Sequence, residues 1–213
     1  DLEIVSESAA DPKARERVAW NIFDVATSDG VAYRAYHVPN NFDRYFLRDW
    51  HERQLRRSAD ALARFRRERR GDVCVIVGNG PSLRRSDLSL LASVDTIISN
   101  FAVLSPDLRR SATILTVVND LVARQGAIDF NALATNKVVP FWLGNHFNES
   151  DATFFVNATV KPEFGLDFVE NASWRSTVSF FNLQLAHAIG YRKVVLIGFD
   201  HSYVQPKGVG EGT

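Results

Sequence analysis

The residues best suited to chemistry form a short loop at 77–83, Val-Gly-Asn-Gly-Pro-Ser-Leu, which directly follows an apolar run. Its two glycines let the backbone turn sharply and approach a ligand closely, and Pro81 suits the first turn of a helix. Free N–H groups at the start of a helix favour a phosphate. Asn79 adds an amide that donates and accepts hydrogen bonds, or else it stands there only because asparagine tolerates turn geometry. We therefore expect Gly78, Asn79, Gly80 and Ser82 to bind a nucleotide.

Two better-known phosphate loops are excluded by the residues around this one. Leu83 stands where the third glycine of the dinucleotide fingerprint belongs, and no Lys-Ser or Lys-Thr pair follows as in a Walker A loop. ATP handling by a P-loop is therefore not predicted.

Polar residues also end the next two apolar runs of the chain. Asn100 follows one run, and Asn119 and Asp120 follow the other. In an open α/β sheet, ligands bind beyond the carboxyl ends of the strands, so these side chains are expected to face the same crevice as the loop. Asp120 has a second interpretation, as the N-cap of the helix that follows it.

The last apolar run leads into a further polar group. Asp200, His201 and Tyr203 supply a carboxylate, an imidazole and a phenol, which can bind sugar hydroxyls or transfer protons, unless they are ordinary turn residues. We predict Asp200 as a catalytic residue and His201 and Tyr203 as substrate contacts. Thr177 and Ser179 open the preceding helix, where they either hold a second phosphate or simply cap the helix.

No metal site is predicted. The five histidines show no paired spacing, and no Asp-x-Asp cluster of the kind found in many metal-dependent sugar transferases occurs. We expect no tightly bound cofactor, with a nucleotide-sugar as co-substrate. Cys74, the single cysteine, lies inside an apolar run and is interpreted as a buried thiol.

These residues need a frame that brings them together, and the apolar pattern predicts one. Short β-branched runs typical of buried parallel strands occur at 72–77, 96–99, 113–118, 137–143 and 193–197. Helical patterns alternate with them at 83–92, 120–125 and 176–189. We predict an α/β fold, a Rossmann-like, doubly wound and mostly parallel sheet, with an N-terminal helical extension.

The predicted division lies at residue 71. Residues 1–70 form the extension, with a short helical stretch around 15–23, a turn at 28–30 and a long amphipathic helix from 41 to 70. The end of that helix is strongly basic, which is either a solvated face that suits the helix dipole or a surface for an anionic membrane or a second subunit. Residues 71–213 form the nucleotide-binding domain.

Composition limits the class of protein. The 213 residues carry 25 basic and 25 acidic side chains, so no net positive charge favours nucleic acid as a partner. No apolar stretch reaches the ~18 residues of a membrane span, and the N-terminus lacks the pattern of a signal peptide. We expect a cytoplasmic protein, with peripheral membrane contact as an option.

Taken together, the segments at 75–83, 98–100, 176–179, 188–193 and 196–203 resemble two related groups of proteins. One is the family-42 bacterial sialyltransferases. The other is the set similar to the archaeal 6-hydroxymethylpterin diphosphokinase, which includes motility accessory factors linked to flagellin glycosylation. The resemblance covers about residues 72–204 and leaves the N-terminal third unmatched. The Thr177-Val178-Ser179 segment is closer to the second group.

The resemblance implies roles for individual residues. Asn79, Ser82 and Asn100 would hold the nucleotide, Asn119 would contact the ribose or donor sugar, and Thr177 with Ser179 would approach the phosphate. Asp200 would close the site. The catalytic histidine of the sialyltransferases follows the strand that ends near Asp200, and His201 does not match it. The general base is therefore expected beyond Thr213, with the domain truncated at its C-terminus.

These residues and the resemblance together leave three functions open. The first is metal-independent sugar transfer from a nucleotide-sugar, such as a CMP-sugar, to a glycan or protein in bacterial surface or flagellin glycosylation. The second is diphosphoryl transfer from Mg-ATP to a pterin-type alcohol. The third is a non-catalytic nucleotide-binding or scaffold module.

Overall fold

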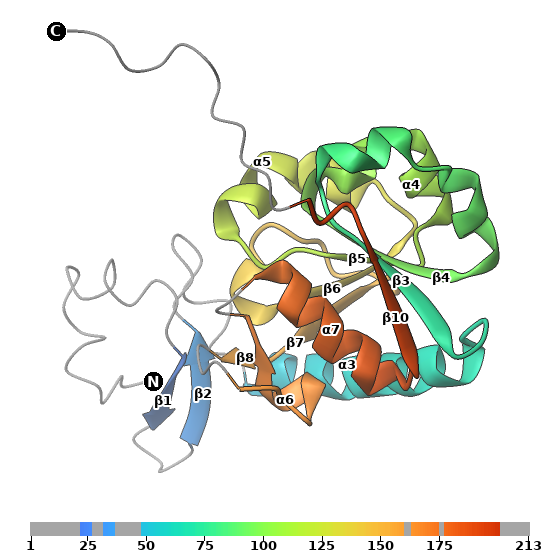
Figure 1. Ribbon diagram of the computed structural model, residues 1–213. Coiled ribbons are helices and arrows are strands. Elements are labelled where there is room, and N and C mark those ends of the chain that lie inside the picture. Colours follow the sequence, from blue (N-terminus) through green and yellow to red (C-terminus); the bar gives the residue numbers. More distant parts are fainter. Residues whose placement is uncertain (1–21, 27–31, 37–47, 160–162, 175–176, 201–213) are drawn as a thin grey trace, which may run out of the picture.

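A sheet of six parallel strands forms the centre of the molecule, in the order β10-β3-β4-β5-β6-β7 (Figure 1). The computed structural model describes residues 22–26, 32–36, 48–159, 163–174 and 177–200. The strands of the sheet are β3 (Val73–Val77), β4 (Asp95–Ser99), β5 (Ile114–Thr116), β6 (Asn136–Pro140), β7 (Thr153–Val156) and β10 (Lys193–Ile197). Most are apolar and buried along their length, because helices cover both faces of a sheet of this kind.

The order of the strands creates a switch point beside β3. The chain moves outward from β3 through β7 and then returns to place β10 on the other side of β3. The predicted α/β, doubly wound sheet is therefore confirmed. Crevices that bind ligands in such sheets lie at this point, beyond the carboxyl ends of the strands on its two sides, which are β3 and β10 here.

Helices form a layer on each side of the sheet (Figure 1). On one side, α3 contacts β7 and α7, and α7 contacts β3 and β4. The helices are α3 (Arg48–Glu68), α4 (Pro106–Ser111), α5 (Asp120–Asn131), α6 (Phe168–Asn171) and α7 (Val178–Ile189). The 3₁₀ turns are η2 (Pro81–Arg85), η3 (Leu88–Ser93), η4 (Asn100–Leu104) and η5 (Phe141–Leu143).

Two small pairs of strands complete the described residues. β1 (Ile22–Ala26) and β2 (Ala32–Tyr36) form an antiparallel hairpin, and β8 (Ala158–Thr159) pairs in parallel with β9 (Ala172–Ser173). The helical stretch predicted around 15–23 is wrong at its end, because Ile22 and Phe23 belong to β1. Residues 15–21 and the turn predicted at 28–30 lie outside the described residues.

Several predicted elements have different limits in the structure. The helix predicted at 83–92 is two 3₁₀ turns, because Ser86 and Asp87 are extended and Asp87 caps the second turn. The strand predicted at 137–143 ends at Pro140, and the one at 113–118 is confined to Ile114–Thr116. Helix α5 runs past the predicted end at 125 to Asn131, and Gly126 within it leaves room for the Phe130 ring.

Helix α3 packs on the sheet although it lies before residue 71. Ala61 and Phe65 belong to the hydrophobic core, and the Ser58 hydroxyl donates to the carbonyl of Phe155 at 2.6 Å. The predicted limits of the domains, 1–70 and 71–213, stay a prediction. Among the described residues no helix combines the length and the apolar character needed to cross a membrane.

The basic end of α3 is partly used inside the molecule. Arg66 donates to the carbonyl of Ala188 at 2.7 Å, Arg57 donates to the carbonyl of Ser150, and Arg64 pairs with Glu68. Arg53 and Arg67 are exposed. A contact of this face with a membrane or a second subunit stays a prediction.

Strand β10 stands out in this sheet because it is poorly covered. Val195 is 46% exposed and Leu196 is 49% exposed, whereas the strands at the centre of the sheet are buried. In the part of the chain that the structure describes, β10 pairs only with β3. Among the described residues its outer edge therefore has no strand partner, and two of its apolar side chains are about half exposed.

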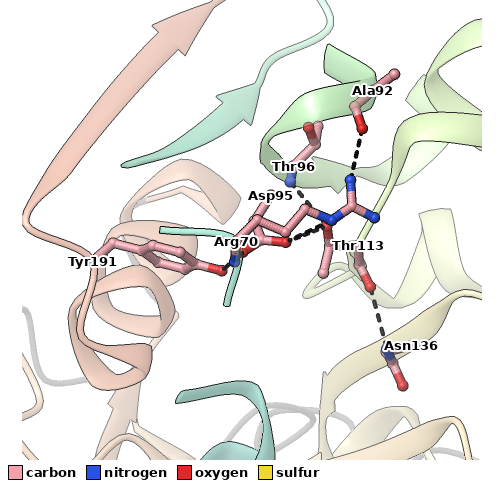
Figure 2. A network of polar contacts seen from close by, with 7 residues as sticks. All are labelled: Arg70, Ala92, Asp95, Thr96, Thr113, Asn136 and Tyr191. Carbon is pink, nitrogen blue, oxygen red and sulfur yellow. Dashed lines mark hydrogen bonds and ion pairs between the residues drawn. The ribbon is translucent and has the colours of Figure 1, made fainter. Parts of the chain in front are cut away.

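A buried carboxylate ties several segments together at the amino end of the sheet (Figure 2). Asp95 opens β4 and accepts hydrogen bonds from the Tyr191 hydroxyl at 2.7 Å and from the backbone N–H of Arg70 at 2.7 Å. The Thr113 hydroxyl donates to the same carboxylate at 3.2 Å, and the Arg70 guanidinium lies 3.8 Å away. The turn between α3 and β3, the start of β4, the turn before β5 and the turn before β10 are thus joined at one residue.

Two buried groups near Asp95 are expected to make the stability of the fold depend on alkaline pH. Burial raises the pKa of the Cys74 thiol to about 12, and the Asp95 charge adds to this shift. Burial and the hydrogen bond to Asp95 also raise the pKa of Tyr191. In the unfolded chain these groups ionise near ~8.5 and ~10, so above these values the unfolded state loses protons that the folded state keeps.

We therefore expect the free energy of unfolding to be unaffected by these groups below pH ~8.5 and to fall as the pH rises further. The limit is about 1.4 kcal/mol per pH unit for each group. Urea unfolding followed by tryptophan fluorescence at pH 7, 9 and 10 measures this slope, and the double variant Cys74→Ala with Tyr191→Phe should flatten it. Equal stability of the wild-type chain at pH 7 and pH 10 would contradict the prediction.

Candidate functional site

The glycine loop is fastened to the end of β10. The N–H of Gly78 donates to the carbonyl of Ile197 at 2.8 Å, and the N–H of Gly80 donates to the carbonyl of Gly198 at 2.9 Å. A Cβ on Gly78 would lie 2.3 Å from the Gly198 oxygen. Both glycines are therefore needed for a close backbone approach between the ends of β3 and β10. The loop follows the first strand of the sheet, as predicted, and the order of the strands places it at the switch point.

Asp200 supports the same loop from the other strand. Its Oδ2 accepts a hydrogen bond from the backbone N–H of Ser82 at 2.7 Å, and a Cβ on Gly80 would lie 2.5 Å from this oxygen. The carboxylate therefore holds the start of η2 against β10. The catalytic role of Asp200 stays a prediction, and His201 and Tyr203 lie outside the described residues.

Two hollows, each of about 500 Å³, flank the glycine loop. Arg84 lines both of them, Arg85 and Asp200 line the first, and Asn79 and Phe101 line the second. Arg84 and Arg85 belong to η2 and are exposed. A guanidinium beside a glycine loop is a strong partner for phosphate oxygens, because it donates two parallel charge-assisted hydrogen bonds. Neither arginine was picked out from the sequence.

Asn100 is strained and incompletely bonded. Its φ is 54°, the only positive value among the described residues that are not glycine. Its side-chain oxygen is buried and has no hydrogen-bond partner in the described part of the chain. Backbone strain of this kind costs about 1–3 kcal/mol and concentrates at functional sites. The sequence located Asn100 at a strand end but gave no sign of its conformation.

The structural roles of Asn119 and Asp120 differ from those expected from the sequence. Asn119, not Asp120, is the N-cap of α5, and its Oδ1 accepts from the N–H of Val122 at 3.2 Å. Asp120 is the first residue of the helix, and its Oδ1 lies 2.8 Å from Nε2 of His146. The alternative of Asp120 as N-cap is therefore wrong. The histidine spacing along the sequence did not indicate this pair, because the two residues follow neighbouring strands.

Thr177 and Ser179 open α7. The Thr177 hydroxyl accepts from the N–H of Phe180 at 3.2 Å, so Thr177 is the N-cap. Since α7 runs antiparallel to the strands it connects, its first turn lies at the carboxyl edge of the sheet. Nucleotide contacts of Thr177 and Ser179 stay predictions.

A buried polar cluster fixes α7 over that edge. The Asn182 side chain donates to the Ser99 hydroxyl at 2.7 Å and accepts from the Thr116 hydroxyl at 2.6 Å. Ser99 and Thr116 end β4 and β5, and all three residues are buried. The cluster holds the start of α7 against the strand ends that precede Asn100 and Asn119. It was not found from the sequence, because its members are ordinary residues far apart in the chain.

Comparisons of the chain with known protein families, curated proteins and solved structures find no match. The geometry of this edge is therefore the basis for the function. The glycine loop, Asn100 and Asn119 lie at the carboxyl ends of strands, as predicted, and the start of α7 lies at the same edge of the sheet. Arg84, Arg85 and His146 join them in the structure.

Proposed function

We propose that the chain is the nucleotide-binding domain of a transferase that moves a sugar from a nucleotide-sugar, with a CMP-sugar as first candidate. The acceptor would be a glycan or a protein of the bacterial surface or flagellum. The observation that carries the proposal is the glycine loop at the switch point, fastened to β10 and flanked by two hollows lined by Arg84. This is the place in an open α/β sheet where nucleotides bind.

Positive charge near the loop supports a transfer that needs no metal. When the acceptor oxygen attacks the anomeric carbon, the bond from that carbon to the phosphate oxygen breaks and the nucleotide leaves with the electron pair. Arg84 and Arg85 are available to stabilise the charge that builds up on this phosphate. The buried oxygen of Asn100 is an acceptor for a hydroxyl or amino group of the ligand.

Isothermal titration with CMP, CDP, UDP, GDP and ATP, each with and without Mg²⁺, tests this proposal. We expect binding of CMP without metal. The Asn79→Ala variant should raise the dissociation constant about tenfold, because Asn79 is exposed and lines a hollow. The melting temperature of this variant should equal that of the wild-type chain. Asn171→Ala, which removes an exposed asparagine from α6, is the matched control.

The same titration separates the three functions. A requirement for Mg²⁺ with ATP would replace the sugar transferase by the diphosphoryl transferase. If the wild-type chain bound none of the five nucleotides, the scaffold module would be favoured. An unchanged dissociation constant in Asn79→Ala would show that Asn79 is not part of the site.

A further inference from the structure

The pair of His146 and Asp120 lies at the carboxyl edge of the sheet, outside the glycine loop. Asp120 follows β5, and His146 follows β6 and the turn η5. The strands are neighbours, so two residues 26 positions apart in sequence meet at 2.8 Å. The His146 side chain is 12% exposed and that of Asp120 is 24% exposed, so solvent reaches both in part.

The hydrogen bond determines which ring nitrogen of neutral His146 is free. A carboxylate only accepts hydrogen bonds, so Nε2 carries the proton and donates it to Asp120. The lone pair of the neutral imidazole is then on Nδ1. Among the described residues, no partner binds Nδ1. A histidine oriented in this way by a carboxylate is the arrangement that enzymes use for a general base.

The backbone around His146 is held firmly in place. Its N–H donates to the carbonyl of Leu143 at 2.9 Å, and its carbonyl accepts from the Asn131 amide at 2.7 Å. The Asn131 oxygen in turn accepts from the N–H of Asn148 at 2.7 Å. Asn131 thus clamps both sides of the short segment that carries His146. A side chain carried on a fixed backbone segment needs less reorganisation to reach a productive geometry.

The pair lies where the sugar of a bound nucleotide-sugar would be expected. β5 and β6 are two and three strands away from β3, so their ends stand about 10 and 14 Å from the glycine loop. A nucleotide bound at the loop and extending along the edge would bring its sugar toward these strand ends. Asn100 and Asn119, at the ends of the strands between, lie along that path.

We propose that Nδ1 of His146 is the general base of the reaction, with Asp120 as the residue that positions it. This rests on the proposed function. The acceptor hydroxyl gives its proton to Nδ1 as its oxygen bonds to the anomeric carbon, and the bond to the donor phosphate breaks with its electron pair. The imidazolium then returns the proton to water. The base expected beyond Thr213 is not needed in this scheme.

The test combines binding with turnover in the full chain. The probe is the nucleotide-sugar whose nucleotide binds most tightly, and release of the nucleotide during transfer to water gives the rate. We expect His146→Gln to leave the dissociation constant of the nucleotide within about twofold and to lower kcat by about 100-fold. His187→Gln, which changes an exposed histidine of α7, is the matched control and should keep the wild-type rate.

Asp120 needs a readout that a purely structural role would not give. Asp120→Asn should lower kcat about tenfold with KM unchanged, and Asp120→Glu should recover part of the rate because it restores a negatively charged acceptor for Nε2. Nitrogen NMR of the unliganded chain labelled at histidine adds a measurement that needs no substrate. It should show the Nε2 proton in the neutral ring of His146, and a proton on Nδ1 would overturn the proposal.

The remaining outcomes separate the two proposals. A wild-type chain that binds no nucleotide overturns the proposed function, and the role of His146 with it. Full turnover in His146→Gln, with binding retained, overturns the role of His146 alone. Binding without turnover in the wild-type chain also overturns that role, because the described residues would then not contain the base.

Discussion

Replacement of Gly78 by alanine is expected to abolish nucleotide binding and to destabilise the fold. The added Cβ would lie 2.3 Å from the Gly198 carbonyl oxygen, which is backbone and cannot move aside like a flexible side chain. The hydrogen bond from Gly78 to Ile197 must then break, and β10 must shift away from β3. We expect the free energy of unfolding to fall by about 1–3 kcal/mol. The dissociation constant of the nucleotide should rise by at least about 100-fold.

Urea unfolding and nucleotide titration of the same preparation check this result. Asn79→Ala is the informative comparison, because it changes the neighbouring side chain and leaves the backbone of the loop in place. It should weaken binding while keeping stability. If Gly78→Ala kept both properties of the wild-type chain, the close approach of β3 and β10 at the loop would not be essential for the site.

The second large effect is expected at the other end of the sheet, for Asp95→Ala. The substitution leaves the buried Tyr191 hydroxyl and the Arg70 N–H without their acceptor and removes the partner of Thr113. A buried polar group without a partner costs about 1–3 kcal/mol, so we expect the free energy of unfolding to fall by about 3 kcal/mol. Nucleotide affinity of the folded fraction should stay unchanged, since the network lies at the amino end of the strands.

Chemical unfolding of Asp95→Ala beside Asp72→Ala measures the effect. Asp72 is an exposed carboxylate at the same end of the sheet, paired with Arg69 in a surface ion pair, and its loss should cost less than about 1 kcal/mol. A similar small loss in both variants would show that the buried network contributes no more than a surface pair.

The sheet could be predicted from the sequence where burial alone decides the structure. The run at 72–77 matches β3 to within one residue, because a strand buried between other elements needs a short β-branched apolar run. The run at 193–197 has the same bounds as β10, although that strand is only partly covered. Limits were missed where local backbone geometry decides. The 3₁₀ turns at 81–93 carry the same apolar residues that a helix would, and β7 lies in an aromatic run without clear strand limits.

The candidate site divides in the same way. The glycine loop, Asn100 and Asn119 were found because they sit directly after strands, which is a property of the local sequence. The pair of Asp120 with His146 and the cluster of Asn182 with Ser99 and Thr116 depend on which strands and helices become neighbours. No single segment of the sequence determines the order of the strands. These contacts therefore could not be predicted from the spacing of residues along the chain.

The hydrogen bonds between the glycine loop and the end of β10 also determine when the site forms during folding. β3 and β10 pair residue for residue although 115 residues separate the end of one from the start of the other, between Val77 and Lys193. During synthesis, the loop leaves the ribosome long before the strand that fastens it. Closing so long a stretch of chain is entropically costly and slows folding. The nucleotide crevice is therefore completed late, so a nascent chain that has made only β3 to β7 has a sheet without its ligand site.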